Sequence, residues 1–355
     1  MTKQEKILIV DDTASNIDTL IAVLGDKYDL RVAVDGETAL SVLQQPVLPD
    51  LILLDIMMPG MDGYDVCRTI KGSERTRGIR IVFLTAMAES KDQEKGLMLG
   101  AEDYITKPFD PAIVLARVRT QLELKGYRDS LEEQVASRTE ELAHAQEATI
   151  ASLAIMAEYR DPETGGHIQR TKSYIRLLAS ALRQTNPDLI SESQQELLYQ
   201  AAPLHDIGKV AIPDAILLKP ARLNADEFAI MEKHTIYGSD AIRRTATIYG
   251  ENKLLQVAAK IAKFHHEKWD GSGYPDGCSG ETIPLCARMM AIADVYDALI
   301  SKRPYKEAFS HEQAVATILE GDGYTCPEHF DPMIINCFEK IHDQFHQVAL
   351  MFGDS

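Results

Sequence analysis

Short apolar runs alternate with amphipathic stretches through the first third of the chain. Runs of this length are typical of buried strands, and the stretches between them place apolar residues at helical spacing. Five strand and helix pairs in alternation predict a doubly wound parallel sheet. We expect strands at Ile7–Val10, Leu30–Val34, Leu51–Leu54, Ile81–Leu84 and Asp103–Ile105, and helices near 14–24, 36–44, 62–71, 89–99 and 110–123.

A second pattern begins after this unit. From Leu115 to about Tyr159 the chain has no proline and its charges alternate, which predicts a long helix with Gly126 as a candidate break. A heptad pattern can be drawn, but half of its seam is polar or small, so the coiled coil is weak. One interpretation is a single solvated helix. A helix this polar would be marginal alone, so we favour a parallel homodimer stem. The seam rows are Leu124, Leu131, Arg138, Ala145 and Ser152, and Arg128, Val135, Leu142, Thr149 and Met156.

After Tyr159 the apolar spacing is helical, and no run of alternating strands follows. This pattern predicts an all-α bundle with polar ligands projecting inward. The candidate helices lie at 167–184, 193–207, 226–234, 238–248, 253–266, 285–300 and 311–320, separated by turn signals at 186–188, 219–224 and 270–277. The predicted organisation is therefore multidomain: an α/β unit over 1–124, a helical linker over 125–150 and an all-α unit over 151–355.

Composition narrows the class of protein. At 355 residues the chain is too long for one core, and it has no stretch of 18 apolar residues that could span a membrane. Its five cysteines show no CxxC spacing, as expected for reduced thiols in a cytoplasmic protein. The net charge of −17 argues against nucleic-acid polymers as partners. An anionic small molecule stays compatible, because local positive charge can override the global sign.

Polar residues follow the predicted strands and should meet at one edge of the sheet. Asp11 and Asp12 follow the first strand, Asp55 the third, Thr85 the fourth and Lys107 the fifth. Three carboxylates in one place repel each other unless a cation joins them, and Mg²⁺ suits such a set. Asp55 could then accept a phosphoryl group. Thr85 and Lys107 could contact the new phosphate oxygens.

The runs VDD (10–12), LLDIMMPGMDGY (53–64), LTA (84–86) and DYITKPF (103–109) resemble the receiver domain of bacterial response regulators, a flavodoxin-like fold. The resemblance covers the whole unit. It implies phosphorylation of Asp55, with a cognate sensor histidine kinase as partner. It also implies Mg²⁺ bound by Asp11, Asp12, Asp55 and the Met57 carbonyl, and a switch formed by Thr85, Tyr104 and Lys107. The alternative is a receiver-like fold that is never phosphorylated.

Residues that can bind metal recur through the second half of the chain. Two of the pieces are doublets followed by glycine-rich sequence, in HDIGK (205–209) and HHEKWDGSGYP (265–275). A lone histidine is usually structural, but two such doublets favour a metal-dependent hydrolase. Adjacent residues on a helix point about 100° apart, so a doublet could serve two neighbouring metals, or one metal plus a bridging position. Nitrogen and oxygen donors without sulfur allow Fe, Mn, Ni, Co or Zn. The candidate ligands are Glu163, His167, His205, Asp206, His234, His265, His266 and Asp294.

These two runs, with RMMAIADVYDALISKRPYK (288–306), resemble the HD-GYP branch of the HD phosphohydrolases over about residues 150–345. The resemblance implies that the second unit is an HD-type helical bundle that hydrolyses cyclic di-GMP by a metal-activated bridging hydroxide, with either pGpG or GMP as the final product. It implies that all the candidate ligands bind two or three divalent metals, with Glu163 serving a third. Asp206 and Lys209 are the expected catalytic residues.

The remaining site residues concern the substrate. Lys209 could reach a phosphate oxygen, and Arg303 and Lys306 could hold the second phosphate or a guanine edge. The alternative without a function is that Lys209 is a solvent-exposed lysine and that Arg303 and Lys306 are an ordinary surface pair. Asp297 is expected to support a neighbouring ligand or to cap a turn. The loop residues Gly273, Tyr274 and Pro275 should offer close backbone approach and an aromatic face.

Three functions are compatible with this pattern. The leading one is a phosphorylation-regulated cyclic di-GMP phosphodiesterase. The second is a non-catalytic nucleotide-binding scaffold, which the complete ligand set disfavours. The third is a hydrolase of another cyclic dinucleotide such as 3′,3′-cGAMP, because the choice between guanine and adenine depends on pocket shape. The sequence leaves open whether phosphorylation activates or inhibits.

Overall fold

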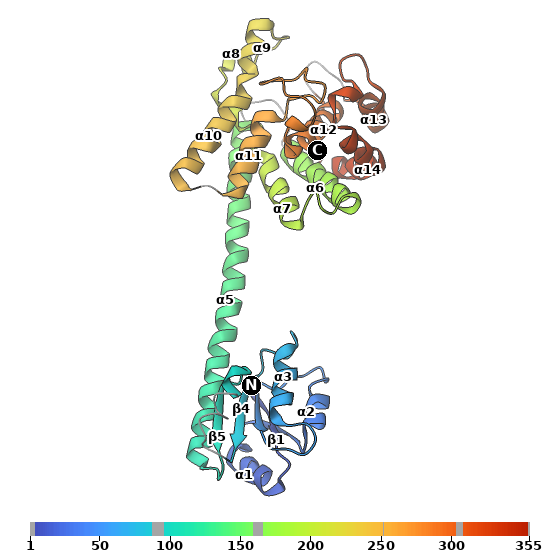
Figure 1. The fold of residues 1–355 in the computed structure, drawn as a ribbon. Helices are drawn as coiled ribbons and strands as arrows, with labels where there is room; N and C mark the ends of the chain where they lie inside the picture. Colours follow the sequence, from blue (N-terminus) through green and yellow to red (C-terminus); the bar gives the residue numbers. More distant parts are fainter. Residues whose placement is uncertain (1–3, 87–95, 159–165, 251, 303–307, 354–355) are drawn as a thin grey trace. The chain divides into compact units, whose positions relative to one another are not determined.

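The structure is a computed structural model that describes residues 4–86, 96–158, 166–250, 252–302 and 308–353. It divides into two compact units, Met1–Glu140 and Glu141–Ser355, which are treated separately below (Figure 1). Within the described ranges, no helix combines the length and the apolar character needed to cross a membrane.

The first unit contains a five-stranded parallel sheet in the order β2-β1-β3-β4-β5. Alternate residues of the central strands enter two separate apolar cores, one on each face, as expected for a parallel sheet covered on both sides. The predicted doubly wound sheet is confirmed. The strands are β1 (Lys6–Val10), β2 (Asp29–Ala33), β3 (Leu51–Asp55), β4 (Arg80–Thr85) and β5 (Asp103–Thr106).

Helices cover the two faces of this sheet. One face packs on α2 (Gly36–Val42) and α3 (Gly63–Gly72), and the other on α1 (Ala14–Leu24) and the first part of α5 (Pro111–Glu158). The expected helix at 89–99 falls largely outside the described residues.

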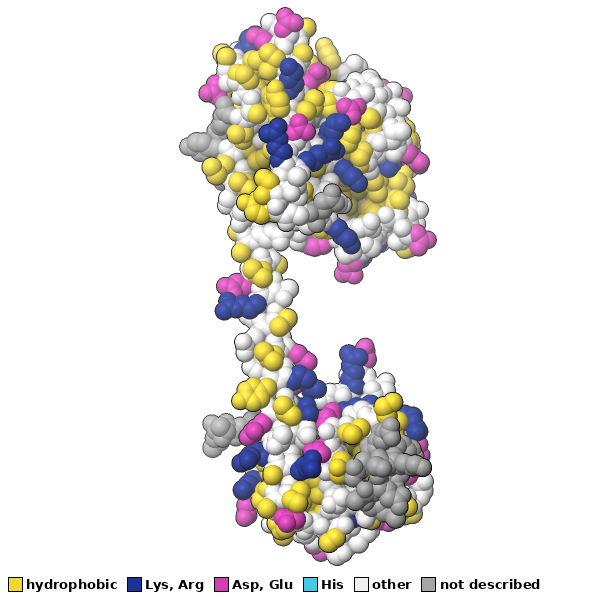
Figure 2. Space-filling model, turned by 60° about the vertical axis from the view of Figure 1, so that its left-hand side comes forward, with side chains coloured by type: hydrophobic (Ala, Val, Ile, Leu, Met, Phe, Trp, Pro, Cys, Tyr) yellow, Lys and Arg dark blue, Asp and Glu magenta, His cyan; other side chains and the backbone are white. Residues whose placement is uncertain are grey.

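Helix α5 is continuous over 48 residues. Gly126 lies inside it and does not break it, so that part of the prediction was wrong. Three apolar seam residues are largely exposed on it: Leu131 at 60%, Val135 at 65% and Leu142 at 70%. Figure 2 shows hydrophobic side chains along the exposed length of this helix.

The second unit is all-α, as predicted, and its described residues contain no strand. Its core gathers aromatic rings from several helices: Tyr174 stacks on Phe345 with 4.3 Å between ring centroids, and both contact Tyr296. The helices are α6 (His167–Thr185), α7 (Glu192–Ala201), α8 (Asp214–Leu217), α9 (Ala225–Met231), α10 (Lys233–Tyr249), α11 (Lys253–Phe264), α12 (Leu285–Ile300), α13 (His311–Glu320) and α14 (Pro332–Met351). The 3₁₀ helices are η1 (Ala202–Leu204), η2 (Ile207–Ala211), η3 (Gly280–Thr282) and η4 (Pro327–His329).

Several elements of this unit differ from the prediction. The helix expected at 193–207 ends at Ala201, because Pro203 lacks the N–H that would continue the helix, and two 3₁₀ turns follow. Residues 233–249 form one helix rather than parts of two. Helix α14 was not predicted, although Asp331 caps it and Pro332 occupies its first position, a readable start signal.

Candidate metal centre

Seven of the eight predicted ligands lie in two neighbouring groups. The first holds Asp206, His234, His265 and His266, and the second holds His167, His205 and Asp294. Within each group the ligand atoms lie within 4.8 Å of one another. The eighth predicted ligand, Glu163, lies outside the described residues.

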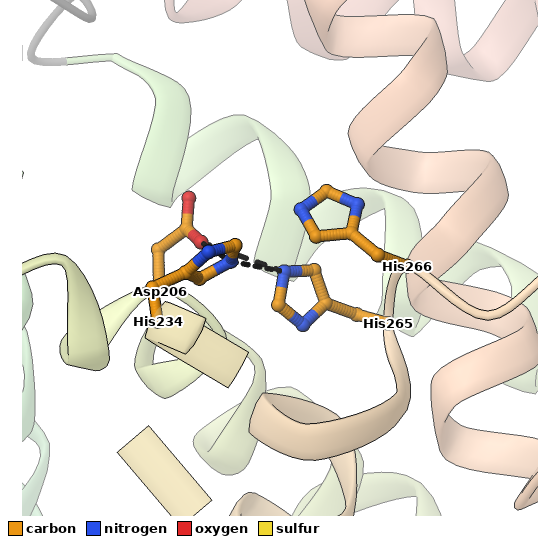
Figure 3. A group of neighbouring side chains, drawn as sticks. All are labelled: Asp206, His234, His265 and His266. Carbon is orange, nitrogen blue, oxygen red and sulfur yellow. Dashed lines mark hydrogen bonds and ion pairs between the residues drawn. The ribbon is translucent and has the colours of Figure 1, made fainter. Parts of the chain in front are cut away.

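The first group is built around one carboxylate oxygen (Figure 3). Oδ1 of Asp206 lies 3.2 Å from Nε2 of His234 and 3.4 Å from Nε2 of His265. The two Nε2 atoms are themselves 3.4 Å apart. The ring of His266 lies beside that of His265, with 4.0 Å between centroids.

The second group adjoins the first through the same aspartate. Nε2 of His167 lies 3.3 Å from Nε2 of His205 and 4.0 Å from Oδ1 of Asp294. Oδ2 of Asp206 lies 3.4 Å from Nε2 of His205. Asp206 therefore faces one group with each of its oxygens, which is the arrangement of a bridging ligand.

The two doublets, His205-Asp206 and His265-His266, do not lie on regular α-helices, although the prediction placed them there. His205 and Asp206 sit between two 3₁₀ turns, and His265 follows the last residue of α11. His205 and Asp206 serve different groups, as the doublet argument expects, whereas His265 and His266 serve the same one.

The histidine tautomers follow from the acceptors around them. Nδ1 of His205 lies 3.0 Å from the Ala202 carbonyl, and Nδ1 of His234 lies 2.7 Å from the Met231 carbonyl. Nδ1 of His265 lies 3.1 Å from the Ile261 carbonyl. A carbonyl oxygen can only accept, so each Nδ1 carries a proton, and in the neutral imidazole Nε2 then presents a lone pair.

With neutral imidazoles, the Nε2 lone pairs of these histidines point toward the Asp206 oxygens, and no proton lies between them. Oδ1 of Asp206 is buried and has no hydrogen-bond partner. A buried acceptor facing other acceptors is costly unless a cation lies between them. Burial, reinforced by His265 and His234, holds the pKa of His266 well below its usual value, so that imidazole is neutral. The residues present fit bound divalent metal.

A buried ion pair orients His167. Nδ1 of His167 lies 2.8 Å from Oδ2 of Asp297, and Nε of Arg170 donates to Oδ1 of Asp297 at 2.6 Å. Burial alone would raise the pKa of Asp297, but the bonds from His167 and Arg170 hold it below its usual value. Asp297 thus contacts one of the predicted ligands, as expected, and the role of that ligand stays a prediction. Arg170 was not anticipated, because nothing in its local sequence marks it as buried.

The backbone of η2, the 3₁₀ helix that follows Asp206, lies directly against the backbone of α10. A Cβ added to Gly208 would lie 1.9 Å from the His234 carbonyl oxygen. The next residue, Lys209, places Nζ 2.8 Å from Oδ2 of Asp206. Lys209 was expected on the same helical face as His205. It is instead held three residues after Asp206 on a 3₁₀ helix, and its side chain is 13% exposed, so it is not a solvent-exposed lysine.

The loop carrying Gly273, Tyr274 and Pro275 folds back on the histidines. A Cβ on Gly273 would lie 2.5 Å from the His266 carbonyl oxygen, and the Tyr274 ring lies 4.8 Å from that of His266. The Tyr274–Pro275 peptide is cis. Glu267, which the sequence reasoning overlooked, is buried and anchors this loop by accepting hydrogen bonds from two backbone N–H groups, those of Asp276 and Cys278.

A cavity of about 120 Å³ opens beside the centre and is lined in part by His266 and Asp294. Lys268, Tyr324 and His329 also line it, and the sequence reasoning had not selected them. Arg303 and Lys306, which it had selected, lie outside the described residues.

In the first unit, the acidic edge forms as expected around a lysine. Nζ of Lys107 lies 2.7 Å from Oδ2 of Asp55 and 2.8 Å from Oδ2 of Asp11. Asp12 belongs to the same group of candidate ligands. Burial raises the pKa of Asp55, an effect that the contacts with Lys107 only partly offset.

Of the other residues expected at this edge, Thr85 and Tyr104 share a cavity and Met57 contacts Asp55. Thr85 ends β4 and, with Tyr104, lines a small cavity that Ile56, the residue after Asp55, also lines. The Met57 backbone N–H donates to Asp55 at 3.4 Å, and the Met57 side chain is exposed.

Comparison with known proteins matches both units. Residues 136–334 match the family described as "HD domain", and residues 7–119 match "Response regulator receiver domain". A "Probable cyclic di-GMP phosphodiesterase" of Vibrio cholerae is 45% identical over 98% of this chain and 80% of its own length. The "Cyclic di-GMP phosphodiesterase response regulator RpfG" of Xanthomonas campestris is 36% identical over 98% and 90%. A "3′3′-cGAMP-specific phosphodiesterase 2" of Vibrio cholerae is 34% identical over 81% of this chain and 51% of its own.

Proposed function

We propose that this chain, which belongs to the family of response regulators that join a receiver domain to an HD domain, is a metal-dependent cyclic di-GMP phosphodiesterase under phosphorylation control. The observation that carries the proposal is the pair of ligand groups sharing Asp206. Two relatives whose names give this activity are similar to the chain over nearly its whole length.

The two groups would hold one divalent metal each. Asp206 would join them, with His234, His265 and His266 on one side and His167, His205 and Asp294 on the other. Metals bound there lower the pKa of a water molecule and neutralise charge on the phosphate. The donor set suits Fe, Mn, Ni, Co or Zn. Glu163 stays our candidate for a third metal.

The chain's own residues would position the substrate. Nζ of Lys209 lies 2.8 Å from Oδ2 of Asp206 and could donate to a phosphate oxygen as the diester binds. Tyr274 lies against His266 and offers an aromatic face to a base. Lys268 and Tyr324 border the adjoining cavity and could contact the second nucleotide, together with Arg303 and Lys306.

The receiver edge supports the regulatory half of the proposal. Asp55 would accept a phosphoryl group from a sensor histidine kinase, with Mg²⁺ held by Asp11, Asp12 and the Met57 carbonyl. Lys107 already lies at hydrogen-bond distance from Asp55 and could pair with the phosphate. Thr85 and Tyr104 would respond to it. The functional division that we propose is 1–124, 125–150 and 151–355, and the boundary between the two compact units, after Glu140, falls inside that linker.

We also propose that α5 forms a parallel homodimer. Leu131, Val135 and Leu142 occupy heptad positions and are 60%, 65% and 70% exposed. Replacing all three with lysine should convert a dimer to a monomer in analytical ultracentrifugation. A parent chain that is monomeric at high concentration would contradict the stem.

A second substrate is favoured by one observation, the similarity to a protein named as cGAMP-specific. The deciding experiment gives metal-loaded full-length protein cyclic di-GMP and 3′,3′-cGAMP and follows the linear products by chromatography. We expect a higher kcat/KM on cyclic di-GMP. Asp206→Ala should abolish turnover, while Asp240→Ala, a control at an exposed position on α10, should not. Preference for cGAMP would favour the alternative substrate, and metal binding without turnover would favour a scaffold.

A further inference from the structure

Helix α13 packs against α14 (Figure 1). Three histidines outside the proposed centre gather where these two helices meet. His311 is the first residue of α13, and His342 and His346 lie four residues apart on α14. Their spacing places the two α14 side chains on one face of that helix. The His311 ring lies 5.2 Å from that of His342 and 4.6 Å from that of His346.

The nitrogen atoms of this cluster face a carboxylate. Nε2 of His311 lies 3.1 Å from Nδ1 of His342. Oδ1 of Asp343 lies 3.9 Å from the first and 3.5 Å from the second. Three donor atoms from three side chains therefore lie within 4.8 Å of one another, at distances that one ion could bridge.

A buried hydroxyl orients the first of these ligands. Nδ1 of His311 lies 2.8 Å from Oη of Tyr296, a residue with no exposed surface. Burial raises the pKa of Tyr296, so its hydroxyl is neutral and can accept a hydrogen bond. When His311 donates Nδ1–H to this oxygen, Nε2 presents its lone pair to His342 and Asp343. Metal-binding histidines are usually held in this way through their second nitrogen.

We propose that His311, His342 and Asp343 form a second, separate site for a divalent transition metal, with His346 as an adjacent further donor. Imidazole-rich sites select Zn²⁺, Ni²⁺ or Cu²⁺ over Mg²⁺ and Ca²⁺. The His311 side chain is 8% exposed and the Asp343 side chain is 91% exposed. The site is therefore open to solvent on the Asp343 side, where an ion can enter. A bound ion would link the start of α13 to α14.

Most of this site lies beyond the family match, which includes His311 but none of its other residues. That match ends at residue 334, before His342, Asp343 and His346. The competing explanation is a hydrogen-bonded histidine cap over Tyr296. That explanation accounts for His311, but it gives no reason for the Asp343 carboxylate to approach both rings, and it predicts no metal binding.

Calorimetric titration of chelator-treated full-length protein with Zn²⁺ tests the proposal. His342→Ala should lower the stoichiometry by about one ion per chain relative to the parent, and Gln344→Ala, an exposed neighbour on α14, should not. Zn²⁺ should raise the thermal midpoint of the parent more than that of His342→Ala, because the link between α13 and α14 is lost.

Two further measurements keep the result unambiguous. If circular dichroism shows that His342→Ala does not fold, Asp343→Asn serves instead, and it should weaken Zn²⁺ binding at the same site. Hydrolysis by either variant, measured with the proposed centre loaded, should match the parent, so failure of this site is distinguishable from failure of the proposed function. Parental stoichiometry and affinity in both variants would overturn the proposal.

Discussion

Replacing Asp297 with asparagine should weaken metal binding without touching a proposed ligand. In the parent, the Asp297 carboxylate accepts from Nδ1 of His167 and from two nitrogens of Arg170. In the variant, the asparagine Oδ1 can still accept a hydrogen bond from Arg170. In that orientation, the asparagine N–H₂ group points toward His167. Two donors would then face each other, so His167 would move its proton to Nε2 and lose the lone pair that faces His205.

The size of the effect follows from this geometry. Loss of an orienting partner of a metal-binding histidine typically lowers metal affinity by about 10–100-fold, or about 1.4–2.7 kcal/mol. Leaving a buried charge without its partner costs about 3–5 kcal/mol of folding free energy. Arg170 keeps the Phe352 carbonyl and the Ser301 hydroxyl, each at 3.0 Å. Because these partners remain, we expect the free energy of unfolding to fall by about 3 kcal/mol, the lower end of that range.

Two assays separate these effects. Competition against a metal chelator gives the affinity, and urea unfolding of the metal-free protein gives the stability. The double variant Arg170→Gln, Asp297→Asn removes the unpaired charge, so it should recover stability but not metal affinity. Gln184→Ala, at an exposed position on α6, is the control and should remain near the parent in both. Parental metal affinity in Asp297→Asn would refute the orientation argument.

The remaining predictions concern other parts of the molecule. Asp55→Asn should abolish any change in hydrolysis on treatment with a small phosphodonor, whereas an undiminished response would exclude Asp55 as the acceptor. Gly208→Ala should destabilise the protein by about 1–3 kcal/mol in urea unfolding, because its Cβ must displace the His234 carbonyl, and a variant as stable as the parent would contradict that packing. The pKa of His266 is lowered on folding, so its contribution to the stability of metal-free protein is complete above pH 6.5, its ordinary pKa, and is lost as the pH falls below it. Urea unfolding between pH 8 and pH 5 should show this decline and a shallower one in His266→Asn, and equal slopes would count against it.

The sequence predicted the sheet because its central strands are buried on both faces and stay apolar throughout, as in Leu51–Leu54. It indicated the candidate ligands because the two doublets among them are rare combinations of residue types. It could not divide the ligands into two groups, because that division depends on the turns at Pro203 and on how η2 packs against α10.

Residues that act through other residues were harder to find. Glu267 follows two histidines, but its bonds to backbone N–H groups nine and eleven positions later depend on the path of the loop. Arg170 pairs with Asp297 across 127 positions. His311 meets His342 only because α13 packs on α14. Such contacts are set by tertiary structure, and no local pattern encodes them.

The imidazoles of the candidate centre are oriented in two different ways. His205, His234 and His265 each donate to a carbonyl three or four residues earlier, so their ring orientation is settled once the local turn forms. His167 instead depends on Asp297, 130 positions away on another helix. Each of the two groups therefore contains locally oriented rings, but only the group of His167 also depends on the packing of α6 against α12 for the orientation of a ring. A distortion that separates α6 from α12 would release the His167 ring and leave the orientation of the other three unchanged.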